Sequence, residues 1–423
     1  MPLTQANLLP PEQIAHVPNG SQGSPFHERT TALNFAQSWQ DWSGFLSANY
    51  YRDEYLEYFS MRNTCGVYDV SPMNKYRFKG ADAEAMLNRL VTRDVSKQPV
   101  NTVQYNVWCT DAGRIIDDGT LFRLADDEFM LTCAEPNMDW FQLAAVGFDR
   151  VEIIDISPEL AALAIQGPTS CALLKAMGFK GVENAKPFDI VKFPYLDGEI
   201  MISRTGFTGD LGYELWLDPK DAITLWDDVF STGRLYGVQP VGMESLEKAR
   251  LEAGFLSPYV DFHPALHTKE KGHDHSPFEM ALSWIVKFDK GHFTGRAALL
   301  KEKQEGKHRR LLKLDIEGNK AAEGAQLFRD KACTKEIGYV TSAMWSPVVK
   351  ANIALGLVEG KYVDGPIYAE VYFQKELRWV RKVCKCIKKT KPFWAPVRAK
   401  QTPAELTQFT GAASAPRSRA SHD

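Results

Sequence analysis

Residues 203–215 read Ser-Arg-Thr-Gly-Phe-Thr-Gly-Asp-Leu-Gly-Tyr-Glu-Leu, and this stretch is the most informative about the fold. Its three glycines allow the backbone to approach a flat ligand closely. Glu214 then follows in a predicted strand between the apolar residues Tyr213 and Leu215. The glycine spacing differs from that of the dinucleotide-binding fingerprint, which should also open a helix. Taken alone, the stretch is explained more simply as a hairpin turn.

A second stretch, Asp111-Ala-Gly-Arg-Ile-Ile-Asp-Asp-Gly-Thr-Leu-Phe122, combines a glycine-containing turn with an apolar strand. Side-chain alternation places Asp117 and Asp118 on opposite faces of that strand, so only one of them should point inward. A carboxylate among apolar neighbours must find a partner or change its pKa, which is how functional carboxylates arise. Spacing alone favours the alternative of a turn or capping aspartate.

The composition sets broad limits on the class of protein. A chain of 423 residues should form two or three packed units, and its net charge of -3 gives no reason to expect nucleic acid. No secretory signal or long apolar segment is present, which predicts a cytoplasmic protein that does not contact membranes. Seven scattered cysteines fit reduced thiols, and Cys384 and Cys386 lack the second ligand pair that a metal site needs.

Changes in residue pattern divide the chain into four parts. Two packing helices are expected at 82–91 and 219–235, whereas short alternating runs after about residue 308 indicate a small all-β module. The polar run 301–307 is the predicted boundary. The expected order is a flexible leader (1–30), an α+β region (31–300), the β module (308–400) and a disordered tail (401–423).

Several further blocks occur in a fixed order with these two stretches. They are Tyr68-Asp-Val-Ser-Pro-Met73, Ala164-Ile-Gln-Gly-Pro168, Arg250-Leu-Glu-Ala-Gly254, Pro277-Phe-Glu-Met-Ala-Leu-Ser-Trp284, Phe293-Thr-Gly-Arg296, Gly338-Tyr-Val-Thr-Ser342 and Trp345-Ser-Pro347. Each block is weak by itself. Together, from about residue 45 to residue 394, they resemble the glycine-cleavage T-protein (aminomethyltransferase) family.

The resemblance implies a three-part α+β cloverleaf in which two subdomains intertwine and a C-terminal β-barrel completes the fold. It also implies that tetrahydrofolate is the cofactor and lies in a central channel. Asp118 matches the family's essential aspartate beside the folate nitrogens, and Glu214 matches the residue that pairs with the pterin edge. Tyr105, Met73 and Trp284 match positions that wall the pterin, although Met73 and Trp284 are equally well explained as core residues.

The sequence also departs from the family at several positions. Leu246 stands where an arginine is usual, Cys133 where an asparagine is usual and Phe207 where a tyrosine is usual; Phe207 and Cys133 are still counted as predicted folate contacts. The segment 255–275 is longer than in typical T-proteins and contains four histidines. A solvated loop explains them better than a metal site, so no metal is predicted.

This longer segment suggests a pocket for a small organic methyl donor, formed by Tyr259, Phe262, His263 and His267 together with Leu246. The predicted activity is therefore a demethylase that moves a methyl or methylene group from that donor to N5 of tetrahydrofolate. Asp118 would orient the pterin, and Tyr105, Tyr259 or His263 would protonate the leaving group.

Two alternatives for the function remain open. One is the aminomethyltransferase of the glycine cleavage system, which acts on a lipoylated carrier protein. The other is a non-catalytic folate-binding protein, which the same fold would also support.

Overall fold

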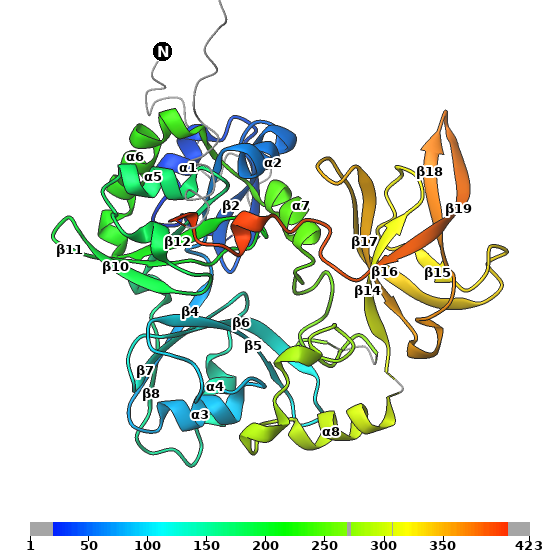
Figure 1. The fold of residues 1–423 in the computed structure, drawn as a ribbon, viewed down its shortest axis with the longest axis horizontal. Helices are drawn as coiled ribbons and strands as arrows, with labels where there is room; N and C mark the ends of the chain where they lie inside the picture. The colour runs from blue at the N-terminus through cyan, green and yellow to red at the C-terminus, as the bar shows by residue number, and fades with distance from the viewer. Residues whose placement is uncertain (1–19, 269–271, 307, 405–423) are drawn as a thin grey trace, which may run out of the picture.

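The computed structural model describes residues 20–268, 272–306 and 308–404. They form three lobes arranged around a common centre (Figure 1). The predicted α+β cloverleaf with a closed C-terminal barrel is confirmed. Among the helices of these residues, none is both long enough and apolar enough to cross a bilayer.

The first lobe is a six-stranded sheet in the order β10-β11-β12-β9-β3-β13, in which only β3 and β13 pair in parallel. Helices on one face bury the core formed by β9, β11 and β12, and α2 and α7 lie on the other side. The strands are β3 (Cys65–Asp69), β9 (Ala161–Gln166), β10 (Ile190–Tyr195), β11 (Gly198–Ser203), β12 (Gly212–Leu217) and β13 (Val238–Pro240). The helices are α1 (His27–Leu33), α2 (Glu54–Asn63), α5 (Ser170–Ala176), α6 (Ala222–Gly233) and α7 (Met243–Ala253). A hairpin of β1 (Ser38–Trp42) and β2 (Phe45–Tyr50) lies between α1 and α2 in the chain.

The second lobe is a five-stranded antiparallel sheet in the order β5-β6-β7-β4-β8. Its strands are β4 (Asn74–Lys79), β5 (Thr102–Cys109), β6 (Ile115–Arg123), β7 (Glu128–Cys133) and β8 (Glu152–Asp155). Helices α3 (Ala83–Leu90) and α4 (Met138–Ala144) cover one face. Because β4 is the next strand after β3 and β9 is the next strand after β8, the chain passes from the first lobe to the second and back.

The third lobe is a closed barrel in the order β14-β17-β16-β15-β18-β19, and helix α8 (Arg296–Glu305) precedes it. Its strands are β14 (Arg310–Ile316), β15 (Gln326–Phe328), β16 (Glu336–Ser346), β17 (Ala351–Val358), β18 (Ile367–Lys375) and β19 (Arg378–Lys389). Short 3-10 turns lie at η3 (Ser157–Glu159), η4 (Val182–Asn184), η5 (Pro219–Asp221), η6 (Arg234–Tyr236), η7 (Ser283–Ile285), η8 (Phe288–Lys290), η9 (Gly360–Tyr362) and η10 (Val397–Ala399).

Both predicted packing helices are confirmed. The apolar stripe of α3 is completely buried against the second sheet. At the other helix, the Asp218 carboxylate accepts the backbone N–H of Lys220, as an N-cap residue should. Residues 219–236 then form a 3-10 turn, α6 and a second 3-10 turn, and Gly237 ends the run with a positive φ of 67°.

The predicted boundaries need correction at three places. The flexible leader was placed too far into the chain, because Phe26 is fully buried against Trp226 and α1 begins at residue 27. The disordered tail was also placed too early, since Arg204 donates to the carbonyl of Gln401 at 2.6 Å. The polar run 301–305 is helical and belongs to α8. Residues 1–19 and 405–423 lie outside the described part of the chain.

A buried ion pair within the first lobe is hydrogen-bonded to the barrel. Arg62 on α2 donates to Glu252 on α7 at 2.6 Å, and both side chains are at most 1% exposed. The Glu252 carboxylate also accepts hydroxyl groups from Tyr58 on α2 and Ser346 on β16. Since an unpaired charge here would have no water to solvate it, this network fixes how the lobes dock.

Replacing Glu252 with alanine tests that conclusion. We expect Glu252→Ala to lower the free energy of unfolding by about 3–5 kcal/mol, because the buried Arg62 would lose its 2.6 Å partner and keep only the longer ion pair with Asp210 at 3.6 Å. Urea unfolding at pH 7.5 measures the change. Glu244→Ala, on the exposed side of the same helix, serves as the control and should change stability by less than about 0.5 kcal/mol. A loss for Glu252→Ala as small as the control's would contradict the role of the pair.

Candidate active site

The inner face of the second sheet presents one carboxylate toward the centre of the molecule. Tyr105 on β5 pairs with Thr120 on β6, so both side chains share a face with Asp118, two residues before Thr120. The Tyr105 hydroxyl donates to Asp118 Oδ2 at 2.7 Å. Asp118 is therefore held in place by a strand neighbour and remains partly exposed.

The first sheet presents a second carboxylate in a corresponding row. Register places Tyr68 on β3, Ala164 on β9, Glu214 on β12 and Ser203 on β11 side by side across four strands. These side chains therefore share one face of the sheet. Glu214 is 8% exposed, and the Thr205 hydroxyl donates to it at 2.5 Å.

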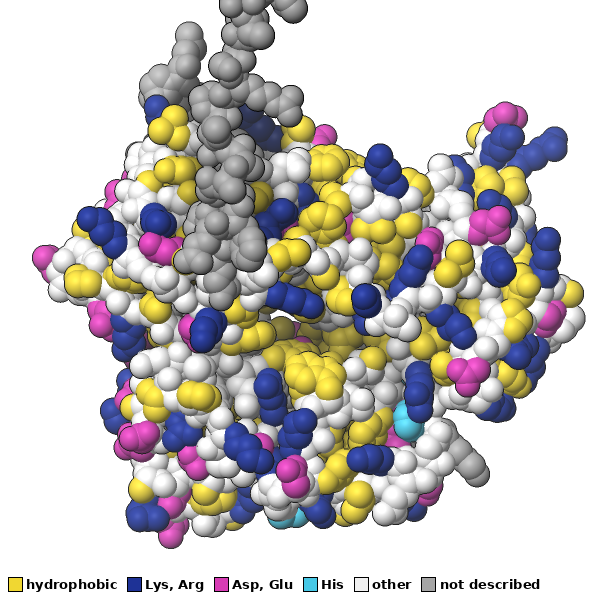
Figure 2. Space-filling model, viewed as in Figure 1, with side chains coloured by type: hydrophobic (Ala, Val, Ile, Leu, Met, Phe, Trp, Pro, Cys, Tyr) yellow, Lys and Arg dark blue, Asp and Glu magenta, His cyan; other side chains and the backbone are white. Residues whose placement is uncertain are grey.

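The two faces are directed toward each other. Phe122, which shares the face of Asp118, packs against Trp216, which shares the face of Glu214, with ring centroids 5.2 Å apart and an interplanar angle of 76°. Both rings belong to one apolar cluster between the lobes. Asp118 and Glu214 thus project from facing walls beyond this aromatic contact. Figure 2 shows a hollow at the centre of the molecule, rimmed largely by hydrophobic side chains.

Aromatic residues extend the wall around Asp118. The Trp284 ring stacks on Tyr105 at 6.4 Å with an interplanar angle of 24°, and it is 53% exposed. This exposure excludes the alternative that Trp284 is a core residue. Met73 and Phe207 are partly buried at the edge of the cluster that contains Phe122, and Leu246 is 4% exposed in the same cluster.

Burial changes the acidity of these groups. Desolvation raises the pKa of Glu214 to about 7, although hydrogen bonds from Thr205 and Ser203 oppose the shift. Desolvation likewise raises the pKa of Asp118 to about 6, against the hydrogen bond from Tyr105. The pKa of Tyr105 is itself raised well above 10 by burial and by Asp118. Tyr105 therefore keeps its proton. Its hydroxyl group is placed to donate a hydrogen bond to Asp118, which suits it less to the predicted role of a general acid for the leaving group.

The prediction that Asp117 and Asp118 lie on opposite faces of the strand is confirmed: Asp118 lies on the inner face, and Asp117 is fully buried on the other, where it accepts the Asn137 amide at 3.0 Å. The prediction for Cys133 is wrong. Cys133 was predicted to contact folate near Asp118. Its register partner is Gly119, so it shares the face of Asp117, and its thiol donates to the Glu135 carbonyl at 3.2 Å.

Residues of the segment 255–275, which was predicted to bind the methyl donor, form a cluster of their own. The Tyr259 hydroxyl donates to Glu135 at 3.2 Å and lies 2.7 Å from His267 Nδ1, while the His263 ring contacts the Tyr259 ring edge-on at 6.2 Å. Its hydrogen bonds run to Glu135 rather than to Asp118. Phe262 is 1% exposed in the core beneath the barrel, so its predicted contact with substrate is wrong. The described residues contain no group of three or more His, Cys, Asp and Glu side chains arranged to hold a metal.

One residue of the facing walls was missed by the sequence analysis. Tyr68 is 4% exposed, and within the described residues no acceptor takes the proton of its hydroxyl group. Only the small side chain of Ala164 separates it from Glu214 in the row of the first sheet. Tyr68 lies in a quoted motif, but an apolar strand context gave no signal that its hydroxyl group would lack a partner.

Comparison with known proteins gives consistent matches. Residues 26–290 match the family model described as GCVT N-terminal domain, and residues 309–383 match the glycine cleavage T-protein C-terminal barrel domain. An aminomethyltransferase of Caldanaerobacter subterraneus subsp. tengcongensis is 34% identical over 331 residues, which cover 77% of this chain and 85% of the relative. An aminomethyltransferase of Thermotoga maritima is 32% identical over 323 residues, covering 75% of this chain and 85% of that protein.

A solved structure shares the fold. The glycine cleavage system aminomethyltransferase T from Bartonella henselae superimposes with a TM-score of 0.76 and 24% identity, covering 88% of this chain and 98% of that one.

The raised pKa of Glu214 makes stability depend on pH. Because its folded pKa of about 7 lies above the ordinary value of 4.5, Glu214 keeps a proton in the native state between pH 4.5 and pH 7 that the unfolded chain has released. The stability that this proton contributes is fully present below pH 4.5 and is lost as the pH rises through 7. We expect Glu214→Gln to equal wild type at pH 4.5 and to be about 3 kcal/mol more stable at pH 8.

Urea unfolding of both proteins at the two pH values measures this difference. Glu199→Gln, at an exposed position on the neighbouring strand β11, is the control and should show no pH-dependent change. A constant difference between Glu214→Gln and wild type across the range would show that Glu214 is not desolvated.

Proposed function

Since the chain belongs to the glycine-cleavage T-protein family, a family of tetrahydrofolate-dependent one-carbon transferases, we propose that the central hollow holds tetrahydrofolate and that the chain transfers a one-carbon unit to it. The single observation that carries the proposal is the pair of desolvated carboxylates, Asp118 and Glu214, on facing walls. Buried carboxylates with raised pKa values are typical of functional sites.

The chemistry of the first wall fits the edge of a pterin. A carboxylate at Glu214 accepts two N–H groups at once, and such charge-assisted hydrogen bonds are strong. The Tyr68 hydroxyl offers a donor that has no acceptor within the described protein. The small Ala164 side chain between them leaves room for a flat ring. Met73, Phe207 and Trp284 would supply its apolar surroundings.

The second wall fits the reacting end of the cofactor. Tetrahydrofolate supplies a neutral amine nucleophile, N5, when bound. Asp118, with a pKa of about 6, is mostly ionised at neutral pH and would offset positive charge that develops near it. The Tyr105 hydroxyl holds the carboxylate in one orientation. The same carboxylate is basic enough to accept a proton as the donor is released.

For the donor, we propose an aminomethyl group carried by a lipoylated protein. Relatives named aminomethyltransferase, at 32–34% identity over three quarters of the chain, support this alternative better than the demethylase activity predicted from the sequence. Such a donor would enter from a macromolecular partner, and the central hollow opens to the surface seen in Figure 2.

A small methyl donor is the second candidate, and two observations favour it. Leu246 is buried among apolar residues at the position where an arginine is usual, so this chain lacks that polar anchor. In addition, residues 135–140, together with Ile116, Pro264, Leu266 and His267, line a cavity of about 220 Å³. Typical ligand pockets measure about 300–1,000 Å³, so this cavity would admit only a small compound.

The choice of donor can be tested directly. The protein is incubated with tetrahydrofolate and either an aminomethylated lipoyl carrier protein or a panel of methoxyaromatic, sulfonium and methylamine compounds, and the folate product is identified by mass. We expect 5,10-methylenetetrahydrofolate with the carrier only. Formation of 5-methyltetrahydrofolate from a small donor would replace the first candidate by the second. No folate product with either would overturn the proposed transferase activity.

The roles of the two carboxylates predict different kinetic defects. We expect Asp118→Asn to lower kcat about 100-fold or more while the Kd for tetrahydrofolate changes less than about threefold. Glu214→Gln should instead raise that Kd about tenfold or more, because a charge-assisted bond is lost. Steady-state kinetics and calorimetry measure both values, with Glu199→Gln as the control. Equal loss of folate affinity in both variants would contradict the separate roles.

A further inference from the structure

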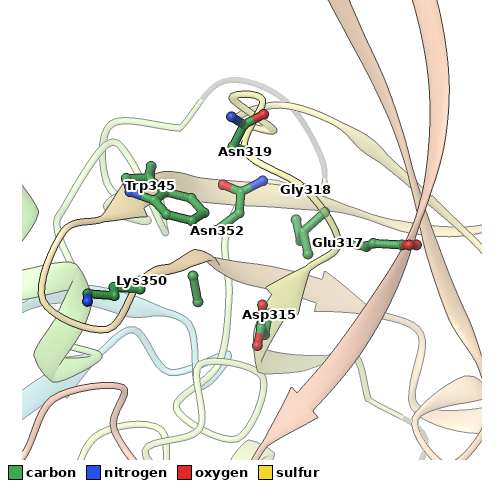
Figure 3. Close-up of a pocket in the computed structure, with 9 residues that line it drawn as sticks. Asp315, Glu317, Gly318, Asn319, Trp345, Lys350 and Asn352 are labelled. Carbon is green, nitrogen blue, oxygen red and sulfur yellow. The ribbon is translucent and has the colours of Figure 1, made fainter.

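The barrel carries a surface pocket of about 430 Å³ beside the end of β14 and the hairpin between β16 and β17 (Figure 3). Trp345 and Asn352 are register partners on one face of this sheet. Asp315 pairs with Ile353, the next residue of β17, so its side chain lies on the opposite face. The polar groups of this pocket therefore do not converge on one point.

The chain returns from the barrel to the first lobe after β19. Residues 394–404, here called the C-terminal strap, pass beside α7 and reach the region of β12 (Figure 1). The backbone N–H of Trp394 donates to the carbonyl of Glu252 on α7 at 2.9 Å. The strap lies beyond residues 309–383, which are the part of the barrel that matches the family model. The family match therefore does not describe the contacts that the strap makes.

The strap is held by a carboxylate in the loop between β11 and β12. Asp210 in this loop has a fully buried side chain, and Arg398 donates to both of its oxygens, at 2.6 and 2.9 Å. The indole N–H of Trp394 also donates to Asp210, at 3.2 Å. A bidentate pair of this kind fixes the two groups in direction as well as in distance.

The loop also binds the backbone of the strap. Arg204, the first residue of the loop, is 5% exposed. It donates to the carbonyls of Arg398 and Gln401 at 3.2 and 2.6 Å. Strap and loop are thus joined near both ends of the loop, through Arg204 at its start and Asp210 close to its end.

Two groups of the proposed folate site lie between these anchors. Thr205 follows Arg204 directly, and its hydroxyl donates to Glu214 at 2.5 Å. Phe207 lies at the edge of the apolar cluster between the lobes, and its ring stacks on Phe255 at 5.7 Å. A shift of the loop at either anchor would move both side chains relative to Glu214.

We propose that the C-terminal strap sets the shape of the folate site, with Arg398 as a positioning residue. The inference rests on the proposed folate binding, because Arg398 acts through Asp210 and the loop rather than on the ring itself. Loss of Arg398 would leave Asp210 with Arg62, at 3.6 Å, as its charged partner, so the loop would be held less tightly. Folate affinity should fall, whereas Asp118, which stands on the other sheet, should keep its function.

Calorimetry with tetrahydrofolate tests this role in the full chain. We expect Arg398→Ala to raise the Kd about tenfold, while the turnover rate at saturating tetrahydrofolate changes less than about twofold. Arg398→Lys should recover only part of the affinity, because an ammonium group keeps the charge but lacks the planar fork. Lys400→Ala, at an exposed position of the strap, is the control and should leave the Kd unchanged.

Limited trypsin digestion of the wild-type chain tests the same coupling without any variant. Because coupling between two sites is mutual, bound tetrahydrofolate should stabilise the docked strap. We expect a saturating concentration to slow cleavage after Arg398 and Lys400 about fivefold or more, with the fragments identified by mass. Cleavage after Arg378, on the exposed hairpin of β18 and β19, is the internal control and should keep its rate.

Two results would overturn this inference. One is a folded Arg398→Ala variant that binds tetrahydrofolate as tightly as the wild type does. The other is a rate of cleavage in the strap that tetrahydrofolate does not change, which decides the question even if Arg398→Ala fails to fold. Failure of the wild-type chain to bind tetrahydrofolate would instead overturn the proposed function itself, and this inference with it.

Discussion

The structure depends on two sheets that face each other and each bury a carboxylate. Asp118 and Glu214 would be costly in an apolar interior, and hydroxyl groups hold both of them: Tyr105 donates to Asp118, and Thr205 donates to Glu214. The aromatic contact between Phe122 and Trp216 closes the space on one side of them. The acids therefore stay desolvated but accessible, which is the condition for charged recognition of a polar ring in a low dielectric.

Buried ion pairs hold the lobes in the arrangement that this site needs. Arg62 and Glu252 join α2, α7 and the barrel, and Arg250 pairs with Asp261 at 2.5 Å to anchor the start of the predicted donor segment. Asp261 also accepts the hydroxyl of Ser342 on β16. Because either partner alone would be an uncompensated buried charge, separating these pairs is costly, which favours the docking geometry that keeps them together.

Prediction from the sequence succeeded where a local pattern decided the outcome. The stripe of α3, the cap at Asp218 and the buried strand around Glu214 follow from periodicity and propensity, and the structure contains all three. It failed for Cys133 and Phe262. For Cys133, the motif aligns the residue with a family position, but the sheet face that its side chain occupies depends on register with strands far away in the chain. Phe262 lies outside the strands, and its burial depends on how its segment packs into the core beneath the barrel.

The sequence by itself determined the family, the α+β class, the closed barrel and the two acidic residues of the candidate site, because these depend on short motifs and alternating patterns. Only the tertiary structure decided that Trp284 lies exposed on Tyr105, that the Tyr68 hydroxyl is left without an acceptor and that Asn352 meets Trp345 at the barrel mouth. Each of these features depends on how different elements of the fold come together. Their geometry is fixed by strand register and lobe docking, which no local stretch of the chain encodes.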